Sequence, residues 1–183
     1  MTIRYGLNNF KDNNGNGSLL LLQPMETRAV RFLQEPGEMA VLRRHYIKGA
    51  GYIHCNGSGC PLCQKASDEW GAPITIARDY FLAVLIDRTD DMVRVFEGGK
   101  TIKNKLLNFS RVNGLTEIDF NLRRSEGKKG KDLYDLIPIV KAPSPLTKEE
   151  RERIKEVALD RLLKRGEKTN EEIEAILEER EAS

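Results

Sequence analysis

Between residues 19 and 140 the apolar positions follow the spacing of β-strands. The clearest case is 80–87, YFLAVLID, a nearly continuous apolar run that is typical of a buried strand. The polar turn 88–91 follows it, and 92–96 predicts the return arm of a hairpin. In 118–122 apolar and polar residues alternate, which indicates one buried and one solvated face. Further strands are predicted at 29–33, 39–47 and 133–140.

A single helix interrupts these strands. In 100–112 the apolar residues Ile102, Leu106, Phe109 and Val112 recur at spacings of four, three and three, which predicts a short amphipathic helix. Five or six short strands with one helix before the last pair fit a small OB-like β-barrel. A β-sandwich needs more strands, and an α/β sheet needs more helices between strands. The predicted fold class is therefore mainly β with α.

The two ends of the chain differ from the strand-rich middle. Residues 1–18 include an Asn- and Gly-rich stretch and predict a flexible arm, so the OB-like domain is placed at 19–140. Pro-rich 141–146 predicts a stiff linker. In 147–183, Thr147 with Glu150 and Thr169 with Glu172 are capping boxes, which predict two short helices arranged as a hairpin. The apolar stripe of this extension either packs on the barrel or docks a partner or a second copy.

Composition and charge narrow the class of protein. The 183 residues are 32% charged and 39% hydrophobic, and apolar runs such as Leu19 to Leu22 and 80–86 are far too short for a membrane helix. No basic-then-apolar leader is visible, and three cysteines favour a reducing compartment, so a cytoplasmic location is expected. The net charge of +2 hides an asymmetry: residues 167–183 carry −5, which leaves +7 on residues 1–166.

All three cysteines lie in one short segment, 55–63, CNGSGCPLC. The spacing Cys60-x-x-Cys63 lets two thiolates face one tetrahedral ion, and the glycines between Cys55 and Cys60 let the loop bend between ligands. The segment therefore predicts one structural zinc that orders a Gly-rich loop. The competing interpretations are buried free thiols or a redox pair, but the βαβ setting of a thioredoxin-like pair is absent from the predicted elements.

A structural zinc site needs a fourth ligand, and the chain has only two histidines, His45 and His54. His54 is adjacent to Cys55, and neighbouring residues seldom reach one ion without strain. His45 lies at the end of a predicted strand, and the turn at 49–51 can bring it back over the loop. The sequence favours His45 and leaves His54 as the alternative.

Basic residues interleaved with aromatic residues suit single-stranded nucleic acid, because cations follow the phosphates and rings stack on unpaired bases. Residues 100–131 hold nine Lys or Arg against three acidic residues, and a second basic run lies at 43–48, just before the cysteines. The candidate nucleic-acid-binding residues are Arg43, Arg44, Tyr46, Lys48, Tyr52, Lys100, Lys103, Arg123, Arg124, Lys128, Lys129, Lys131 and Tyr134. The alternative for each is a solvated surface or an ordinary core position.

No catalytic motif accompanies these residues. The sequence has no Walker loop and no His-Glu-x-x-His, and both histidines lie in or near the cysteine cluster. The protein is therefore expected not to be an enzyme, and no catalytic residue is predicted.

Three stretches together resemble a known family. They are VRFL at 30–33, the segment 45–63 with its CPLC knuckle, and DFNLR at 119–123 with KDLY at 131–134 and Pro138. Over roughly 29–140 the chain resembles the zinc-containing single-stranded DNA-binding, or helix-destabilising, proteins of tailed bacteriophages.

The resemblance implies an OB-fold core and one structural zinc held by His45, Cys55, Cys60 and Cys63. It also implies sequence-independent binding of single-stranded DNA during phage replication, recombination or repair, in the cytoplasm of the host cell. Replication or recombination proteins are expected as partners of the C-terminal helices, self-association is compatible with this function, and no membrane is expected. The alternatives are a phage-encoded adaptor that binds a polymerase or another protein and, second, a zinc-dependent nuclease.

Overall fold

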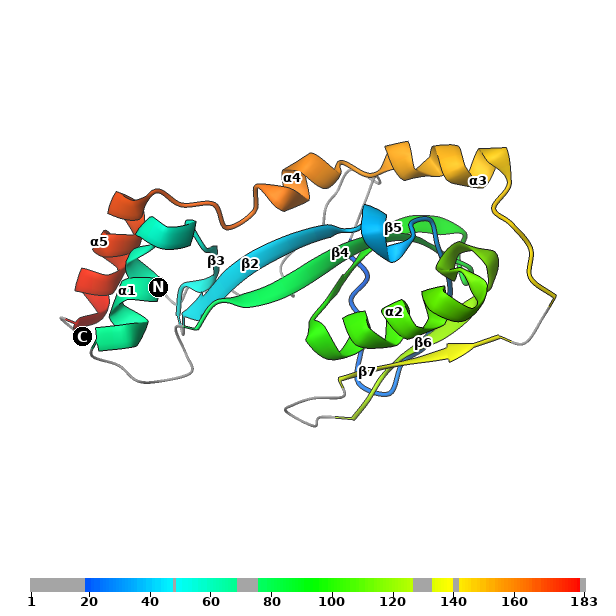
Figure 1. Ribbon diagram of the computed structural model, residues 1–183, viewed down its shortest axis with the longest axis horizontal. Helices are drawn as coiled ribbons and strands as arrows, with labels where there is room; N and C mark the ends of the chain where they lie inside the picture. The colour runs from blue at the N-terminus through cyan, green and yellow to red at the C-terminus, as the bar shows by residue number, and fades with distance from the viewer. Residues whose placement is uncertain (1–18, 48, 69–75, 127–132, 140–141, 182–183) are drawn as a thin grey trace. The chain divides into compact units, whose positions relative to one another are not determined.

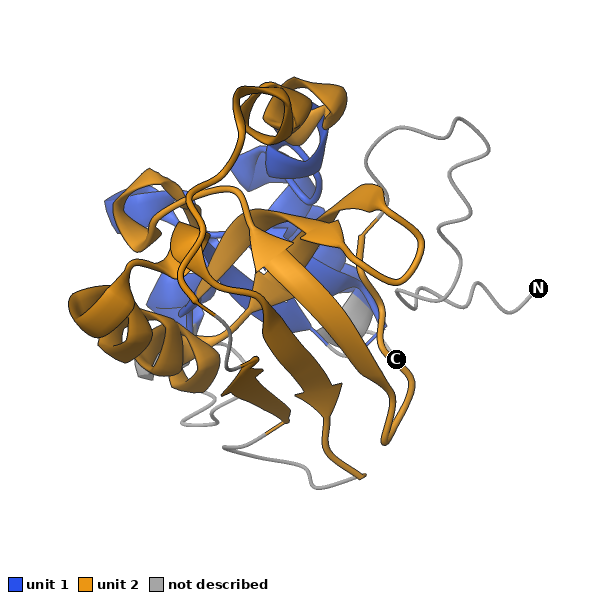
Figure 2. Cartoon of the chain, turned by 90° about the vertical axis from the view of Figure 1, so that its right-hand side faces the viewer, with its two compact units in different colours: residues 1–11, 42–79, 160–183 blue, residues 12–41, 80–159 orange. Residues whose placement is uncertain are grey.

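The chain is divided into two compact units, each built from separate stretches of sequence (Figure 2). Unit 1 holds residues 1–11, 42–79 and 160–183, and unit 2 holds residues 12–41 and 80–159. The computed structural model describes residues 19–47, 49–68, 76–126, 133–139 and 142–181. The predicted arm at 1–18 lies outside these residues, and the domain boundaries expected at 140 and 147 remain predictions.

Unit 2 contains an antiparallel sheet in the order β5–β4–β1–β6–β7. Its strands are β1 (Thr27–Phe32), β4 (Arg78–Asp87), β5 (Met92–Gly98), β6 (Phe120–Arg124) and β7 (Tyr134–Pro138). Strand β4 is central, with β1 on one side and β5 on the other, and its residues 81–87 are all buried. This position confirms the prediction drawn from its continuous apolar run.

The sheet is not closed into a barrel among the described residues. Its edge strands β5 and β7 approach through side chains, since the rings of Phe96 and Tyr134 meet edge to face with centroids 5.1 Å apart. Helix α2 (Lys100–Asn113) packs against both of these strands. Its buried Ile102 and Leu106 join the core of unit 2, as the spacing predicted, whereas Val112, expected on the same face, is 76% exposed near the helix end.

Unit 1 is built around the hairpin of β2 (Ala40–Ile47) and β3 (Gly51–His54), whose strand β2 begins in unit 2. A 3-10 turn at Gly57–Gly59 leads into α1 (Pro61–Asp68), and α5 (Asn170–Glu181) packs against α1 (Figure 1). Ile47, Ile53, Cys60, Leu62, Ile173 and Leu177 form one buried cluster.

The C-terminal extension is helical, but its first helix is shorter than the sequence predicts. It is divided into α3 (Lys148–Glu152), a 3-10 helix (Arg153–Glu156) and α4 (Leu159–Leu163). The break falls at Val157, which is buried and has an extended conformation with φ −96° and ψ 124°. Helix α3 belongs to unit 2 and α5 to unit 1. Both predicted capping boxes are present, at Thr147 and at Thr169.

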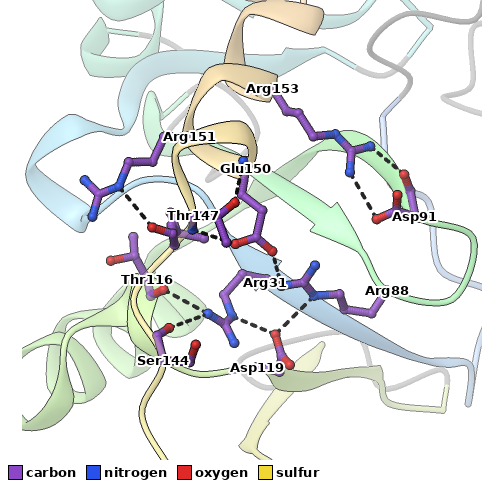
Figure 3. A network of polar contacts seen from close by, with 11 residues as sticks. Arg31, Arg88, Asp91, Thr116, Asp119, Ser144, Thr147, Glu150, Arg151 and Arg153 are labelled. Carbon is purple, nitrogen blue, oxygen red and sulfur yellow. Dashed lines mark hydrogen bonds and ion pairs between the residues drawn. The ribbon is translucent and has the colours of Figure 1, made fainter.

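A polar network ties α3 and the preceding linker to the sheet of unit 2 (Figure 3). The buried Arg31 donates from Nε to Asp119 at 2.6 Å and from Nη1 to the carbonyl oxygens of Thr116 and Ser144. Arg88 donates to Asp119 at 3.3 Å and to Glu150 of α3 at 2.6 Å. These partly buried bonds fix the start of the extension on the sheet of unit 2.

Two further short turns are 3-10 helices at Pro36–Glu38 and Leu115–Glu117. Among the described residues, no helix combines the length and the apolar character that a bilayer crossing requires.

Candidate metal centre and hairpin face

Four potential metal ligands converge in unit 1. One ligand atom each from His45, Cys55, Cys60 and Cys63 lies within 4.8 Å of the other three. His45 Nε2 is 3.4 Å from Cys60 Sγ and 3.5 Å from Cys63 Sγ, and Cys55 Sγ is 3.5 Å from Cys63 Sγ. His45 and Cys60 are fully buried.

These spacings fit a tetrahedral ion. Metal–sulfur bonds of about 2.3 Å and metal–nitrogen bonds of about 2.0–2.1 Å place neighbouring ligands roughly 3.5–3.8 Å apart around zinc. The three short contacts at 3.4–3.5 Å lie close to this range before any ion adjusts them. The residues present therefore fit a structural metal held by one imidazole and three thiolates.

Local structure brings each ligand to this point. Cys55 follows β3 directly, and its N–H donates to the carbonyl oxygen of Arg43 on β2 at 2.9 Å. Pro61 opens α1, where its fixed φ suits the first helical turn and its missing N–H costs no hydrogen bond. The turn then sends Leu62 into the core and returns Cys63 to the cluster, with its N–H on the carbonyl oxygen of Cys60.

The hairpin register shows why His45 and not His54 joins the cluster. His45 pairs with Ile53, and Arg44 pairs with His54, so the two histidines lie on opposite faces of the hairpin. His45 shares its face with Ile47 and Ile53, which are core residues of unit 1. His54 Nε2 is buried and has no hydrogen-bond partner among the described residues, and burial followed by the charge of Arg44 lowers the pKa of His54.

Without a cation, the clustered Cys63 thiol holds its proton tightly. Burial, followed by the hydrogen bond and charge of Cys55, raises the pKa of the Cys63 thiol to about 12. Three thiolates side by side repel one another unless a positive ion lies between them. A coordinated metal reverses this balance, because it holds the bound thiols in their deprotonated form.

The other face of the hairpin carries an aromatic pair. Tyr46 and Tyr52 are directly opposite each other on β2 and β3, with ring centroids 5.2 Å apart. Tyr46 is 49% exposed, whereas the Arg44 side chain is buried with its guanidinium carbon 5.0 Å from the centre of the Tyr52 ring. The buried guanidinium packs against the Tyr52 ring, whereas the Tyr46 ring is open to solvent.

The remaining predicted nucleic-acid residues are spread over both units. Arg43 is exposed on β2, Lys100 is exposed at the start of α2, and Lys103 is half-buried in the same helix. On β6, Arg124 donates to the carbonyl oxygen of Leu22 at 2.6 Å, and Arg123 lies 3.5 Å from the sulfur of Met25. Lys48, Lys128, Lys129 and Lys131 lie outside the described residues.

Tyr134 is placed differently from the other two tyrosines. Its ring packs against the core of unit 2 beside Phe96, and burial raises the pKa of its hydroxyl. Such a ring presents less of its face to a ligand than Tyr46 does.

Sequence reasoning missed the contribution of the C-terminal segment to the metal centre. Asn56 Nδ2 donates to the Lys168 carbonyl oxygen at 3.1 Å and to Asn170 Oδ1 at 2.7 Å, and Asn170 Nδ2 donates to the Gly59 carbonyl oxygen. The residues that interact are more than 100 positions apart, so no local pattern predicts them. The capping box at Thr169 and the apolar stripe with Ile173 and Leu177 predicted the helix, but they did not reveal its partner.

Comparison with protein-family models, with curated proteins and with solved structures finds no match to this chain.

Proposed function

We propose that the protein is a zinc-containing single-stranded DNA-binding protein that binds without sequence preference. The observation that carries the proposal is the exposed Tyr46, paired with Tyr52 on the hairpin whose opposite face builds the His/Cys cluster. A ring open to solvent stacks on any base, because every base has a π-face, and such stacking gives affinity without base readout.

Zinc is the ion that this donor set favours. Soft thiolates select zinc, copper(I) or iron–sulfur clusters, and three cysteines with one histidine form a common structural zinc set. Four protein ligands leave no position for a reactive water, so the ion orders the loop at 55–60 and the base of the hairpin. This supports a binding protein over a zinc-dependent nuclease.

The OB-like fold and the phage family belong to the same proposal. OB-folds are five-stranded, partly open barrels that bind oligonucleotides. Unit 2 has five antiparallel strands, and its edge strands β5 and β7 meet through Phe96 and Tyr134. The resemblance to phage helix-destabilising proteins supports DNA as the ligand, with exposed Arg43 and Lys100 among the groups that contact phosphate.

The stacking face is tested with variants of Tyr46 in fluorescence anisotropy titrations of a labelled oligothymidine. Tyr46→Ala removes the ring and should weaken binding by about 1–3 kcal/mol, whereas Tyr46→Phe keeps the ring and should bind nearly as wild type does. Val41→Ala is the matched control, because Val41 is 52% exposed on the same strand. Equal affinities for wild type and Tyr46→Ala would remove the hairpin face from the binding site. No oligonucleotide binding by wild type would favour the protein-binding adaptor.

A further inference from the structure

Helix α5 shares its core with the metal loop. Ile173 and Leu177 lie one turn apart on one face of α5, and they are 0% and 2% exposed. They belong to the same buried cluster as Cys60 and Leu62, and Cys55 and Cys63 pack against that cluster. The apolar side of the C-terminal helix therefore covers the residues that carry three of the four ligands.

Hydrogen bonds join the segment before α5 to the same loop. Asn56 Nδ2 donates to Asn170 Oδ1 at 2.7 Å, and Asn170 Nδ2 donates to the Gly59 carbonyl oxygen at 3.1 Å. The N–H of His54 at the end of β3 donates to the Gly166 carbonyl oxygen at 2.9 Å. A Cβ atom at Gly166 would lie 2.7 Å from the Tyr52 carbonyl oxygen, which shows how closely the two segments pass.

The loop between Cys55 and Cys60 has no buried residue of its own. Residues 56–59 are all exposed, and two of them are glycines. The metal ligands Cys55 and Cys60 flank the loop, and Asn170 forms hydrogen bonds with Asn56 and Gly59. The apolar face of α5 packs in the same cluster as Cys60. When two interactions order the same segment, each lowers the entropic cost of the other.

We propose that metal binding at His45, Cys55, Cys60 and Cys63 is thermodynamically coupled to docking of α5. The bound ion then keeps the acidic C-terminal helix α5 docked, and loss of the ion releases this helix. The inference rests on the metal of the proposed function, but it does not depend on binding of nucleic acid.

The first test measures zinc affinity of the full-length protein by competition with a chromophoric chelator. Ile173→Ala opens a cavity beside Cys60 and Leu62 and should weaken zinc binding about tenfold, within the roughly 5- to 150-fold range typical of coupled sites. Asn170→Ala removes the bonds to Asn56 and Gly59 without a cavity and should weaken it less. Glu174→Ala on the exposed face of the same helix is the control and should leave the affinity unchanged.

The second test uses reciprocity, because the metal must stabilise α5 as much as α5 stabilises the metal. Removing zinc from the wild-type protein with a chelator should speed hydrogen exchange in peptides covering 170–181. Peptides from β1 and β6 in unit 2 should exchange at an unchanged rate and serve as the internal reference. This measurement needs no variant, so poor folding of Ile173→Ala does not affect it.

The outcomes separate this inference from the proposed function. Normal zinc binding by Ile173→Ala and Asn170→Ala, or unchanged exchange of 170–181 after zinc removal, would overturn the coupling and leave the metal in place. A wild-type protein that binds no zinc would overturn both. Coupling together with a failure to bind oligothymidine would refute only the nucleic-acid proposal.

Discussion

His45 and His54 differ in one property that decides their chemistry, the face of the hairpin on which each lies. The alternation of a β-strand puts His45 with Ile47 and Ile53 toward the core of unit 1, and it puts His54 with Arg44 on the other face. The same alternation separates the candidate metal ligand His45 from the exposed Tyr46. One hairpin therefore supplies two different surfaces from neighbouring residues.

This arrangement predicts unequal effects of the two histidines on metal content. Wild type and His54→Ala should each retain about one zinc per chain, whereas His45→Ala should lose most of it, because three thiolates alone leave a structural site open. His45→Cys should restore binding through a four-cysteine set. Elemental analysis of protein purified without added metal measures this. Retention of zinc by His45→Ala with loss in His54→Ala would reverse the assignment.

At the scale of elements, a network of partly buried ion pairs fastens α3 to the sheet. Arg31 is 8% exposed and Asp119 is 18% exposed at the side chain, and Arg88 links Asp119 to Glu150. Burial alone raises the pKa of Asp119, but the hydrogen bond and charge of Arg31, followed by those of Arg88, outweigh it and hold the pKa below its usual range. The pKa of Glu150 is also lowered. Burial raises it, but the hydrogen bond from the Thr147 N–H and the hydrogen bond and charge of Arg88 outweigh burial.

The lowered pKa of Asp119 predicts acid sensitivity. An unfolded Asp takes up its proton near pH 4, while the folded carboxyl resists protonation to lower pH, so its stabilisation is full above about pH 4 and is lost below it. Asp119→Asn should cost about 2–3 kcal/mol of unfolding free energy at pH 7, because it leaves the buried Arg31 without its counter-charge. It should also flatten the fall in stability as the pH drops below about 4.

Urea unfolding at a series of pH values measures both effects. Glu117→Gln is the control, since Glu117 is an exposed carboxylate in the neighbouring 3-10 turn. An Asp119→Asn protein with wild-type stability and an unchanged pH profile would show that the network contributes nothing.

The elements that sequence predicts well here are those whose pattern is local. The apolar run of β4, the Ile102 and Leu106 face of α2, and the caps at Thr147 and Thr169 each depend on a few neighbouring residues. The packing of Ile173 with Cys60 depends on partners far away in the sequence. The break at Val157 interrupts the apolar spacing that predicted one helix. The cysteine spacing predicted the metal cluster, but the open sheet follows from tertiary packing that no short pattern encodes.

At the scale of the whole molecule, the C-terminal end and the rest of the chain carry net charges of opposite sign. Residues 167–183 carry −5, and within α5 the side chains of Glu174 and Glu178 are exposed. Because Ile173 and Leu177 complete the core of unit 1, deleting this end would damage the metal centre as well as remove charge. Neutralising exposed glutamates isolates the electrostatic contribution.

Glu174→Gln with Glu178→Gln should strengthen binding to oligothymidine at low salt, because fewer carboxylates then compete with phosphates. The gain should shrink as salt rises, since the Debye length falls from about 30 Å at 0.01 M to about 10 Å at 0.1 M. The double Glu→Asp variant keeps the charge and should bind as wild type does. A gain that persists equally at both salt concentrations would point to a change in packing.

The most direct test of the account is a comparison of single-stranded and duplex DNA at two salt concentrations. Anisotropy titrations of wild type with a labelled oligothymidine, and with a duplex of the same length, give both affinities. We expect the single strand to bind more tightly, and the logarithm of its binding constant to fall with the logarithm of salt concentration by roughly 0.7 per phosphate contacted. Absence of binding to the single strand at the lower salt concentration, or equal affinity for the duplex, would contradict the proposed function.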